Sequence, residues 1–163
     1  MPTWIKVPKE SVSKKPVISK TSQRSIIRSI SKPAPRAGKR FMWPVKGRVI
    51  STFGTKSKGL RNDGINIAAP LGTPVLAAEN GVVVYAGNEL RGFGKLILIK
   101  HSGGWVSAYA HNSSFSVKRG DTVNKGQRIA RVGSSGGVSM PQLHFELRKG
   151  RRAQDPIKHL KRA

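Results

Sequence analysis

Residues 62–70 read Asn-Asp-Gly-Ile-Asn-Ile-Ala-Ala-Pro, and residues 142–147 read Gln-Leu-His-Phe-Glu-Leu. Apolar and polar residues alternate in the second stretch, which is typical of a β-strand with one face against a core. Its leucines and its phenylalanine are expected to face that core. The polar residues Gln142, His144 and Glu146 then share the opposite face, where one strand can supply several groups to one site.

The chain beyond residue 40 consists of short runs rich in Val, Ile and Leu, separated by Gly, Asn and Ser. An Asn-Gly pair divides residues 74–87 into two runs and is a strong hairpin signal, because both residues tolerate a positive φ. Residues 95–110 form a second pair of runs around a Ser-Gly-Gly turn. No segment has helical periodicity over the length of a helix, so the pattern predicts an all-β fold of antiparallel strands.

The composition changes at residue 40. Residues 1–40 hold eleven basic residues and a single acid, Glu10, with Ser and Pro scattered among them. Such a segment buries too little apolar area to offset the entropy lost on ordering. We therefore expect residues 1–40 to be a disordered basic tail or linker and residues 41–163 to be one β domain. Three isoleucines between positions 26 and 30 leave open a short amphipathic turn on an anionic membrane surface.

The charge of the chain limits the classes of partner. Thirty-one Lys and Arg residues against seven Asp and Glu residues give a formal net charge of +24 at pH 7, which favours a polyanionic partner. The absence of cysteine excludes disulfides, Cys-ligated zinc and thiol catalysis. No apolar run approaches the roughly 20 residues of a transmembrane helix, and no signal peptide is visible at the N-terminus.

The two quoted stretches resemble the zinc-site segments of LytM-type (M23) peptidoglycan endopeptidases. In that family the first segment runs His-x-Gly-x-Asp-x-x-x-Pro, and the last contains His-x-His. Asn62 stands where the family has its first His, Asn66 replaces the Asp, and Gln142 replaces the first His of the final pair. Of the three metal ligands, His144 remains. The resemblance covers about residues 43–160 and implies a single lysostaphin-like β domain related to barrel-sandwich hybrids.

These substitutions predict that the chain is not an enzyme and binds no metal or other cofactor. Catalytic zinc takes about three protein ligands and a water, and two of the ligand positions here hold neutral amides. In the family, the residues at Gln142 and His111 assist water activation, so Gln142 also removes a titratable group from the place of proton transfer. A rewired metal site that uses His101, Asp63 or His159 stays open as the less favoured alternative.

The lost ligands make the chain similar to the degenerate NlpD and EnvC subgroup. Those proteins cut nothing; they activate periplasmic zinc-dependent N-acetylmuramoyl-L-alanine amidases, by binding the amidase's regulatory helix, for septal peptidoglycan hydrolysis and daughter-cell separation. The resemblance implies the same role, a place in the periplasm or cell envelope, and a longer natural chain with an export signal. The partner helix is expected to dock in the vacant groove, whose rim and floor, by position in the family, are Asn62, Asp63, Asn66, Phe93, Tyr109, His111, Gln142, His144 and Arg148.

Other interpretations stay open from the sequence. Phe93 and Tyr109 are equally compatible with core packing, and Arg148 with a solvated charge. A catalytically dead module that binds peptidoglycan itself fits the basic surface, because stem peptides carry carboxylates. An active zinc endopeptidase is a weaker alternative. Charge alone favours nucleic acid, and no RNA-recognition or helix-turn-helix motif supports specific nucleic-acid binding.

Overall fold

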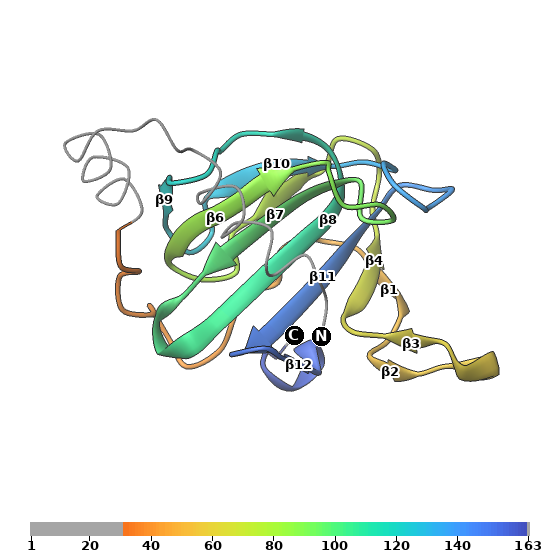
Figure 1. The fold of residues 1–163 in the computed structure, drawn as a ribbon, viewed down its shortest axis with the longest axis horizontal. Coiled ribbons are helices and arrows are strands. Elements are labelled where there is room, and N and C mark those ends of the chain that lie inside the picture. Colours follow the sequence, from red (N-terminus) through yellow and green to blue (C-terminus); the bar gives the residue numbers. More distant parts are fainter. Residues whose placement is uncertain (1–30, 163) are drawn as a thin grey trace, which may run out of the picture.

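The computed structural model describes residues 31–162, and this range contains no α-helix (Figure 1). Within it, no helix is long and apolar enough to cross a membrane. Three 3-10 helices occur in the same range: η2 (Ser57–Gly59), η3 (Ser102–Gly104) and η4 (Pro156–Lys158). The strands are β1 (Arg48–Ser51), β2 (Gly54–Thr55), β3 (Arg61–Asn62), β4 (Ile65–Ala68), β5 (Pro74–Leu76), β6 (Gly81–Gly87), β7 (Lys95–Lys100), β8 (Trp105–Phe115), β9 (Thr122–Val123), β10 (Arg128–Val132), β11 (Gln142–Lys149) and β12 (Arg152–Gln154).

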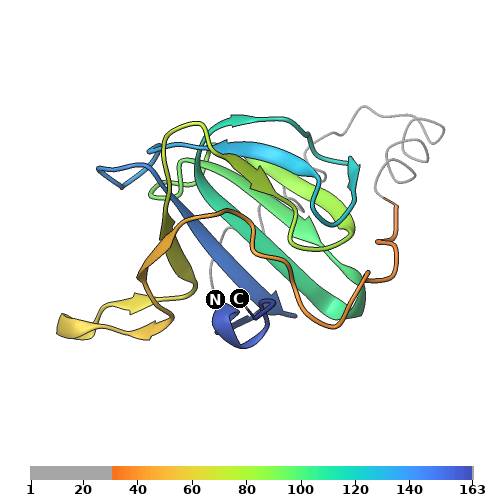
Figure 2. The same cartoon turned by 180° about the vertical axis from the view of Figure 1, so that it is seen from behind.

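β11 lies between β4 and β8 in a ten-stranded sheet (Figure 1). The sheet has the order β1-β4-β11-β8-β7-β6-β9, and β12 pairs with the C-terminal end of β11. β10 pairs with both β8 and β5, and β5 and β10 together fold over the inner part of the sheet (Figure 2). β2 and β3 form a separate two-stranded sheet. Every strand pairing is antiparallel, which confirms the predicted all-β, antiparallel fold class.

The main core fills the space between the large sheet and the strands β5 and β10. Leu143, Phe145 and Leu147 of β11 are fully buried in it, as the alternation in the sequence predicts. A second apolar cluster, which includes Leu96 and Leu98 of β7, covers the other face of β6, β7 and β8. Because both faces of β7 are buried, this strand reads as a near-continuous apolar run.

The N-terminal part of the described chain packs on the domain through Glu79, whose side chain is fully buried. The Glu79 carboxylate accepts hydrogen bonds from the backbone N–H groups of Ala37 at 2.7 Å and Gly38 at 3.3 Å. Nε of Arg36 and Nζ of Lys125 each lie 3.7 Å from the same carboxylate. A buried carboxylate is stabilised by donors of this kind, so the chain segment and the acid hold each other in place.

This contact lies within the predicted tail. The sequence analysis divides tail from β domain at residue 40, and in the structure Arg36, Ala37 and Gly38 already contact Glu79. A basic run carries no local sign that an acid some forty residues later will bind its backbone. Residues 1–30 of the predicted tail lie outside the described residues.

A chain of buried hydrogen bonds joins the β7–β8 hairpin to the turn between β5 and β6. The hydroxyl oxygen of Tyr109 accepts from the N–H of Ala78 at 3.0 Å and lies 2.7 Å from the Ser107 hydroxyl. Ser107 lies 2.7 Å from Nε2 of His101, whose Nδ1 lies 2.7 Å from the carbonyl oxygen of Asn80. That carbonyl can only accept, so Nδ1 carries a proton. Burial lowers the pKa of His101 to about 4, so the imidazole is neutral near pH 7 and Nε2 accepts from the Ser107 hydroxyl.

Acid is expected to destabilise the fold through His101. In the unfolded chain its pKa is near 6.5, so between pH 6.5 and pH 4 the unfolded state binds a proton that the folded state does not. The free energy of unfolding should fall by about 3 kcal/mol over that interval. Urea unfolding at pH 7, 5.5 and 4.5 measures this slope. His101→Gln should remove most of the slope; an unchanged slope in that variant would contradict the assignment.

Candidate functional site

The predicted site residues meet where β3, β4 and β11 come together. In the register of β4 and β11, His144 lies opposite Asn66, and Gln142 is two residues away on the same face of β11. The neighbours of Asn66 in β4, Ile65 and Ile67, are fully buried in the core. The amide of Asn66 therefore points to the face that carries Gln142 and His144.

A close approach at Gly64 sets the position of β3 against β11. A Cβ atom on this residue would lie 2.1 Å from the carbonyl oxygen of Phe145, so no other residue type fits there. The N–H of Gly64 donates to Oδ1 of Asn62 at 3.0 Å. This bond fixes the orientation of the Asn62 amide, because its oxygen must face Gly64 and its nitrogen must face the site.

The three amides and His144 form one hydrogen-bonded array. Nδ2 of Asn62 donates to Oγ of Ser51 at 2.8 Å and to Oδ1 of Asn66 at 3.0 Å. Nδ2 of Asn66 donates to Oε1 of Gln142 at 2.8 Å. The oxygen of Asn66 also lies 3.1 Å from Nδ1 of His144. Because that oxygen can only accept, Nδ1 is a donor.

The other side of the imidazole meets a buried ion pair. Nε2 of His144 lies 2.7 Å from Oε2 of Glu146, and Arg148 binds the second carboxylate oxygen through Nη2 at 2.7 Å and Nε at 3.0 Å. Nη2 of Arg148 also lies 3.6 Å from Asp63, which pairs with Arg61 at 3.0 Å. Both ring nitrogens of His144 are therefore engaged by oxygen atoms of neighbouring side chains.

His111 enters the site from β8 with an unusual backbone conformation. Its φ is 71°, in the left-handed region that residues other than glycine rarely occupy. The N–H of His111 donates to the carbonyl of Phe93, and Nδ1 donates to the carbonyl of Ser135, both at 2.8 Å. Burial lowers the pKa of His111, and the Ser135 carbonyl partly offsets this. The rings of His111 and Phe93 each lie 6.1 Å from the ring of His144.

Two of the predicted groove residues do not line a groove. Tyr109 is fully buried, its ring lies 5.4 Å from that of Phe145, and its hydroxyl belongs to the core hydrogen-bond chain. The positive φ of His111 explains the error, since it interrupts the alternation of β8 and separates the two side chains. Arg148 lies on the site face but is 3% exposed and bound to Glu146, so it is neither a rim anchor nor a solvated charge.

Three residues of the site were not assigned to it from the sequence, and two of them carried no clear signal there. Ser51 and Ser135 reach the site from β1 and from the loop before β11, and serines in such places are common in any chain. Glu146 was the detectable one, because the alternation of β11 places it beside His144. Its role as the partner of both His144 and Arg148 follows from burial, which the sequence does not show.

The donor set does not fit zinc. The positions equivalent to the family's ligands hold the amides of Asn62 and Asn66 and an imidazole whose two nitrogens are engaged. Among the described residues no group of three or more His, Cys, Asp or Glu side chains comes together. His101 is 1% exposed in the core, and the ring of His159 stacks 4.9 Å from that of Trp105. The rewired site considered from the sequence therefore has no structural support.

Residues 60–156 match the family model described as peptidase family M23. The chain belongs to this family. The resemblance seen in the two quoted stretches is thereby confirmed, and the matched range contains the array of Asn62, Asn66 and His144.

Curated relatives of this M23 domain include proteins of cell division and murein hydrolysis. The cell division protein DipM of Caulobacter vibrioides is 48% identical over 143 residues, which are 85% of this chain and 24% of DipM. The lipoprotein NlpD/LppB homolog of Pseudomonas aeruginosa is 48% identical over 75% of this chain and 40% of its own length. The murein hydrolase activator NlpD of Escherichia coli is 46% identical over 74% of this chain and 31% of its own length. The chain thus spans well under half of the length of these relatives.

The M23 domain also matches solved structures. The catalytic domain of lysostaphin from Staphylococcus simulans superposes with a TM-score of 0.64 and 32% identity, over 69% of this chain and 90% of that domain. The predicted lysostaphin-like fold is therefore confirmed. The likeness extends to the backbone fold of the catalytic domain of a peptidase.

Arg148 is expected to matter for folding. Arg148→Ala leaves Glu146 buried without its main partner, which should lower the free energy of unfolding by about 3–5 kcal/mol. Arg152→Ala, at an exposed position of β12, is the matched control and should change it by less than about 0.5 kcal/mol. Urea unfolding of the two variants makes the comparison; equal, small effects would contradict the buried ion pair.

Restoring the ligand set should restore zinc binding. Asn62→His together with Asn66→Asp supplies the missing imidazole and carboxylate beside His144, and should bind zinc roughly a hundredfold more tightly than either single variant. Metal content after dialysis and calorimetric titration measure this. Cleavage of peptidoglycan should additionally require Gln142→His. Equal zinc binding by the unsubstituted chain would contradict the conclusion that the side chains of Asn62, Asn66 and His144 fit zinc poorly.

Proposed function

We propose that this domain activates a zinc-dependent N-acetylmuramoyl-L-alanine amidase for septal peptidoglycan hydrolysis and daughter-cell separation, and cuts no peptidoglycan itself. The observation that carries the proposal is the closed amide array at the metal positions. Asn62, Asn66 and Gln142 satisfy one another's hydrogen bonds, so the site keeps its shape without a cation. Such a site has no group that could activate a water by metal coordination.

The relatives give the proposal its biological setting. One is named a murein hydrolase activator, one a cell division protein and one a lipoprotein. An activator of this kind acts where murein is, so we place the protein in the periplasm or cell envelope. The chain spans a minority of each relative, and the proposed role therefore concerns what the M23 domain contributes.

The docking surface we propose is the face around the amide array. Its floor consists of Asn62, Asn66, Gln142, His144 and His111, and Phe93 lies beside the floor on the loop before β7. A helix of the amidase that enters this face would place an apolar side chain against the Phe93 ring, and aromatic contacts of this kind supply much of the affinity at interfaces.

A second candidate function is direct binding of peptidoglycan by a catalytically inactive module. The net charge of +24 favours it, because the wall carries many carboxylates. Binding to purified wall sacculi, measured by co-sedimentation, separates it from the first proposal. Strong sedimentation with wall and no effect on an amidase would make wall binding the primary function.

Dye release from labelled peptidoglycan tests the activator role. The chain alone should release no dye, and the chain added to a periplasmic zinc amidase should raise release by roughly tenfold or more, since freeing a blocked zinc site acts on the whole catalytic rate. Release by the chain alone that a chelator stops would overturn the proposal. So would an amidase rate that the chain leaves unchanged.

Phe93→Ala in the same assay tests the docking surface. Loss of the ring should raise the concentration needed for half-maximal activation by roughly tenfold, with the free energy of unfolding checked separately. Ile157→Ala is the control, because Ile157 is an exposed apolar residue on η4, beyond the far end of β11, whereas Phe93 is partly buried. An equal effect of both variants would move the docking surface elsewhere.

A further inference from the structure

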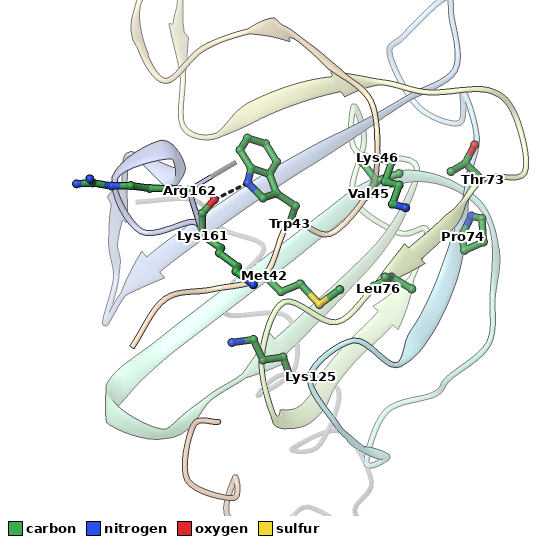
Figure 3. Close-up of a pocket in the computed structure, with 10 residues that line it drawn as sticks. All are labelled: Met42, Trp43, Val45, Lys46, Thr73, Pro74, Leu76, Lys125, Lys161 and Arg162. Atoms are coloured by element: carbon green, nitrogen blue, oxygen red, sulfur yellow. Dashed lines mark hydrogen bonds between the residues drawn. The ribbon is translucent and has the colours of Figure 1, made fainter. Parts of the chain in front are cut away.

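A hollow of about 630 Å³ lies between residues 42–46, β5 and the last described residues of the chain (Figure 3). It shares no residue with the amide array and lies against a different edge of the fold. Apolar side chains form its floor: Met42, Trp43, Val45, Pro74 and Leu76. Its volume is in the range of sites that hold a small ligand or a few side chains.

The rim of this hollow is strongly cationic. Lys46, Lys125, Lys161 and Arg162 line it, and the ten lining residues include no acid. Lys125 is engaged, because its Nζ donates to a backbone carbonyl at 3.0 Å and lies 3.7 Å from Glu79. The side chains of the other three make no hydrogen bond or ion pair with any described residue. The hollow therefore combines an apolar floor with three uncompensated positive charges.

Main-chain groups at the same place lack partners. The N–H of Met42 donates to the carbonyl of Ala78 at 2.9 Å, and the carbonyl of Pro44 accepts from Leu76 at 2.7 Å, so this segment runs antiparallel along the edge of β5. Trp43 lies between these two residues and directs its N–H and C=O away from β5. Neither group bonds to the backbone of any described residue. Phe41 on the same edge is already paired, because its N–H donates to His159 at 2.9 Å and its carbonyl accepts from Lys161 at 2.7 Å. A bound peptide can therefore form main-chain bonds on this edge at Trp43 alone.

We infer that this hollow binds an extended acidic peptide segment of a protein partner. An aliphatic side chain of the segment fills the apolar floor, its main chain bonds to Trp43, and its carboxylates pair with Lys46, Lys161 and Arg162. The concave shape accepts a projecting side chain and does not suit a flat lipid surface. The chain's own basic N-terminal residues carry the same sign of charge as the rim, so they are poor occupants.

A peptide titration followed by NMR tests this inference on the isotope-labelled full chain. The probe is the acetylated and amidated peptide Asp-Ile-Glu-Leu-Glu-Val-Asp, and the control peptide has Lys at each acidic position. The acidic peptide should shift the Trp43 indole and the Val45 and Leu76 methyl signals saturably, and the basic peptide should not. Absence of a saturable shift at these signals overturns the inference.

Charge reversal on the rim locates the binding. Lys46→Glu with Lys161→Glu should weaken peptide binding by roughly tenfold or more, because two close charge pairs become repulsive. Lys100→Glu with Arg152→Glu changes the net charge equally at exposed positions elsewhere and should weaken it less than roughly threefold. Equal losses of peptide affinity in the two variants would show that the peptide responds only to the net charge of the chain, and would overturn the proposed binding site.

Two further experiments distinguish peptide binding from lipid binding and from a part in amidase activation. Phosphatidylglycerol vesicles that produce the same shifts, where the peptide does not, would overturn the peptide in favour of lipid. The amidase assay of the rim variant should give normal activation, since the amide array is unchanged. A rim variant that is folded but fails to activate the amidase would contradict the separation of the two surfaces.

Discussion

One face of β11 packs in the apolar core and the other forms part of a polar array. The rest of the domain depends on both sets of contacts being made at the same time. One face puts Leu143 and Phe145 in the main core, and the other puts His144 and Glu146 in the polar array. A shift of one residue in its pairing with β4 or β8 would exchange the faces and bury a carboxylate among apolar side chains. The close contact at Gly64 adds a second restraint on the register, because it seats the β3–β4 turn directly on the β11 backbone.

The strand that the sequence describes best is the one with a single apolar face. Alternation in residues 142–147 places every side chain of β11 correctly. β8 is different, because both of its faces are buried and its run of Ser, Ala, Tyr and Ala gives no preference for either side. The position in the family placed Tyr109 and His111 at one site, and the left-handed backbone at His111 separates their side chains. A conformation held by tertiary bonds to Phe93 and Ser135 leaves no trace in local sequence.

Long-range polar contacts are the other feature that the sequence hides. Arg148 belongs to a basic run and looks solvated, and Arg36 belongs to a basic tail, yet each is held by a buried carboxylate. The amino-acid composition gives the number of charged residues but does not show which of them are paired in the structure. The chain has seven acids. Among those that the structure describes, the buried ones, Glu79 and Glu146, determine which of the many basic residues become part of the structure. Identifying the buried acids in a very basic chain is therefore more informative than counting the cations.

The amide array changes the function that the groove can perform. A metal site without its metal leaves several ligands that repel one another or need water, and it relaxes when the cation is lost. Here Asn62, Asn66 and Gln142 complete one another's hydrogen bonds, and Gly64 orients the first of them. The surface is thereby preorganised in the absence of any ligand, and a partner that docks on it need not order it first. The scaffold of the M23 family is kept, and in the proposed role its rigidity serves recognition.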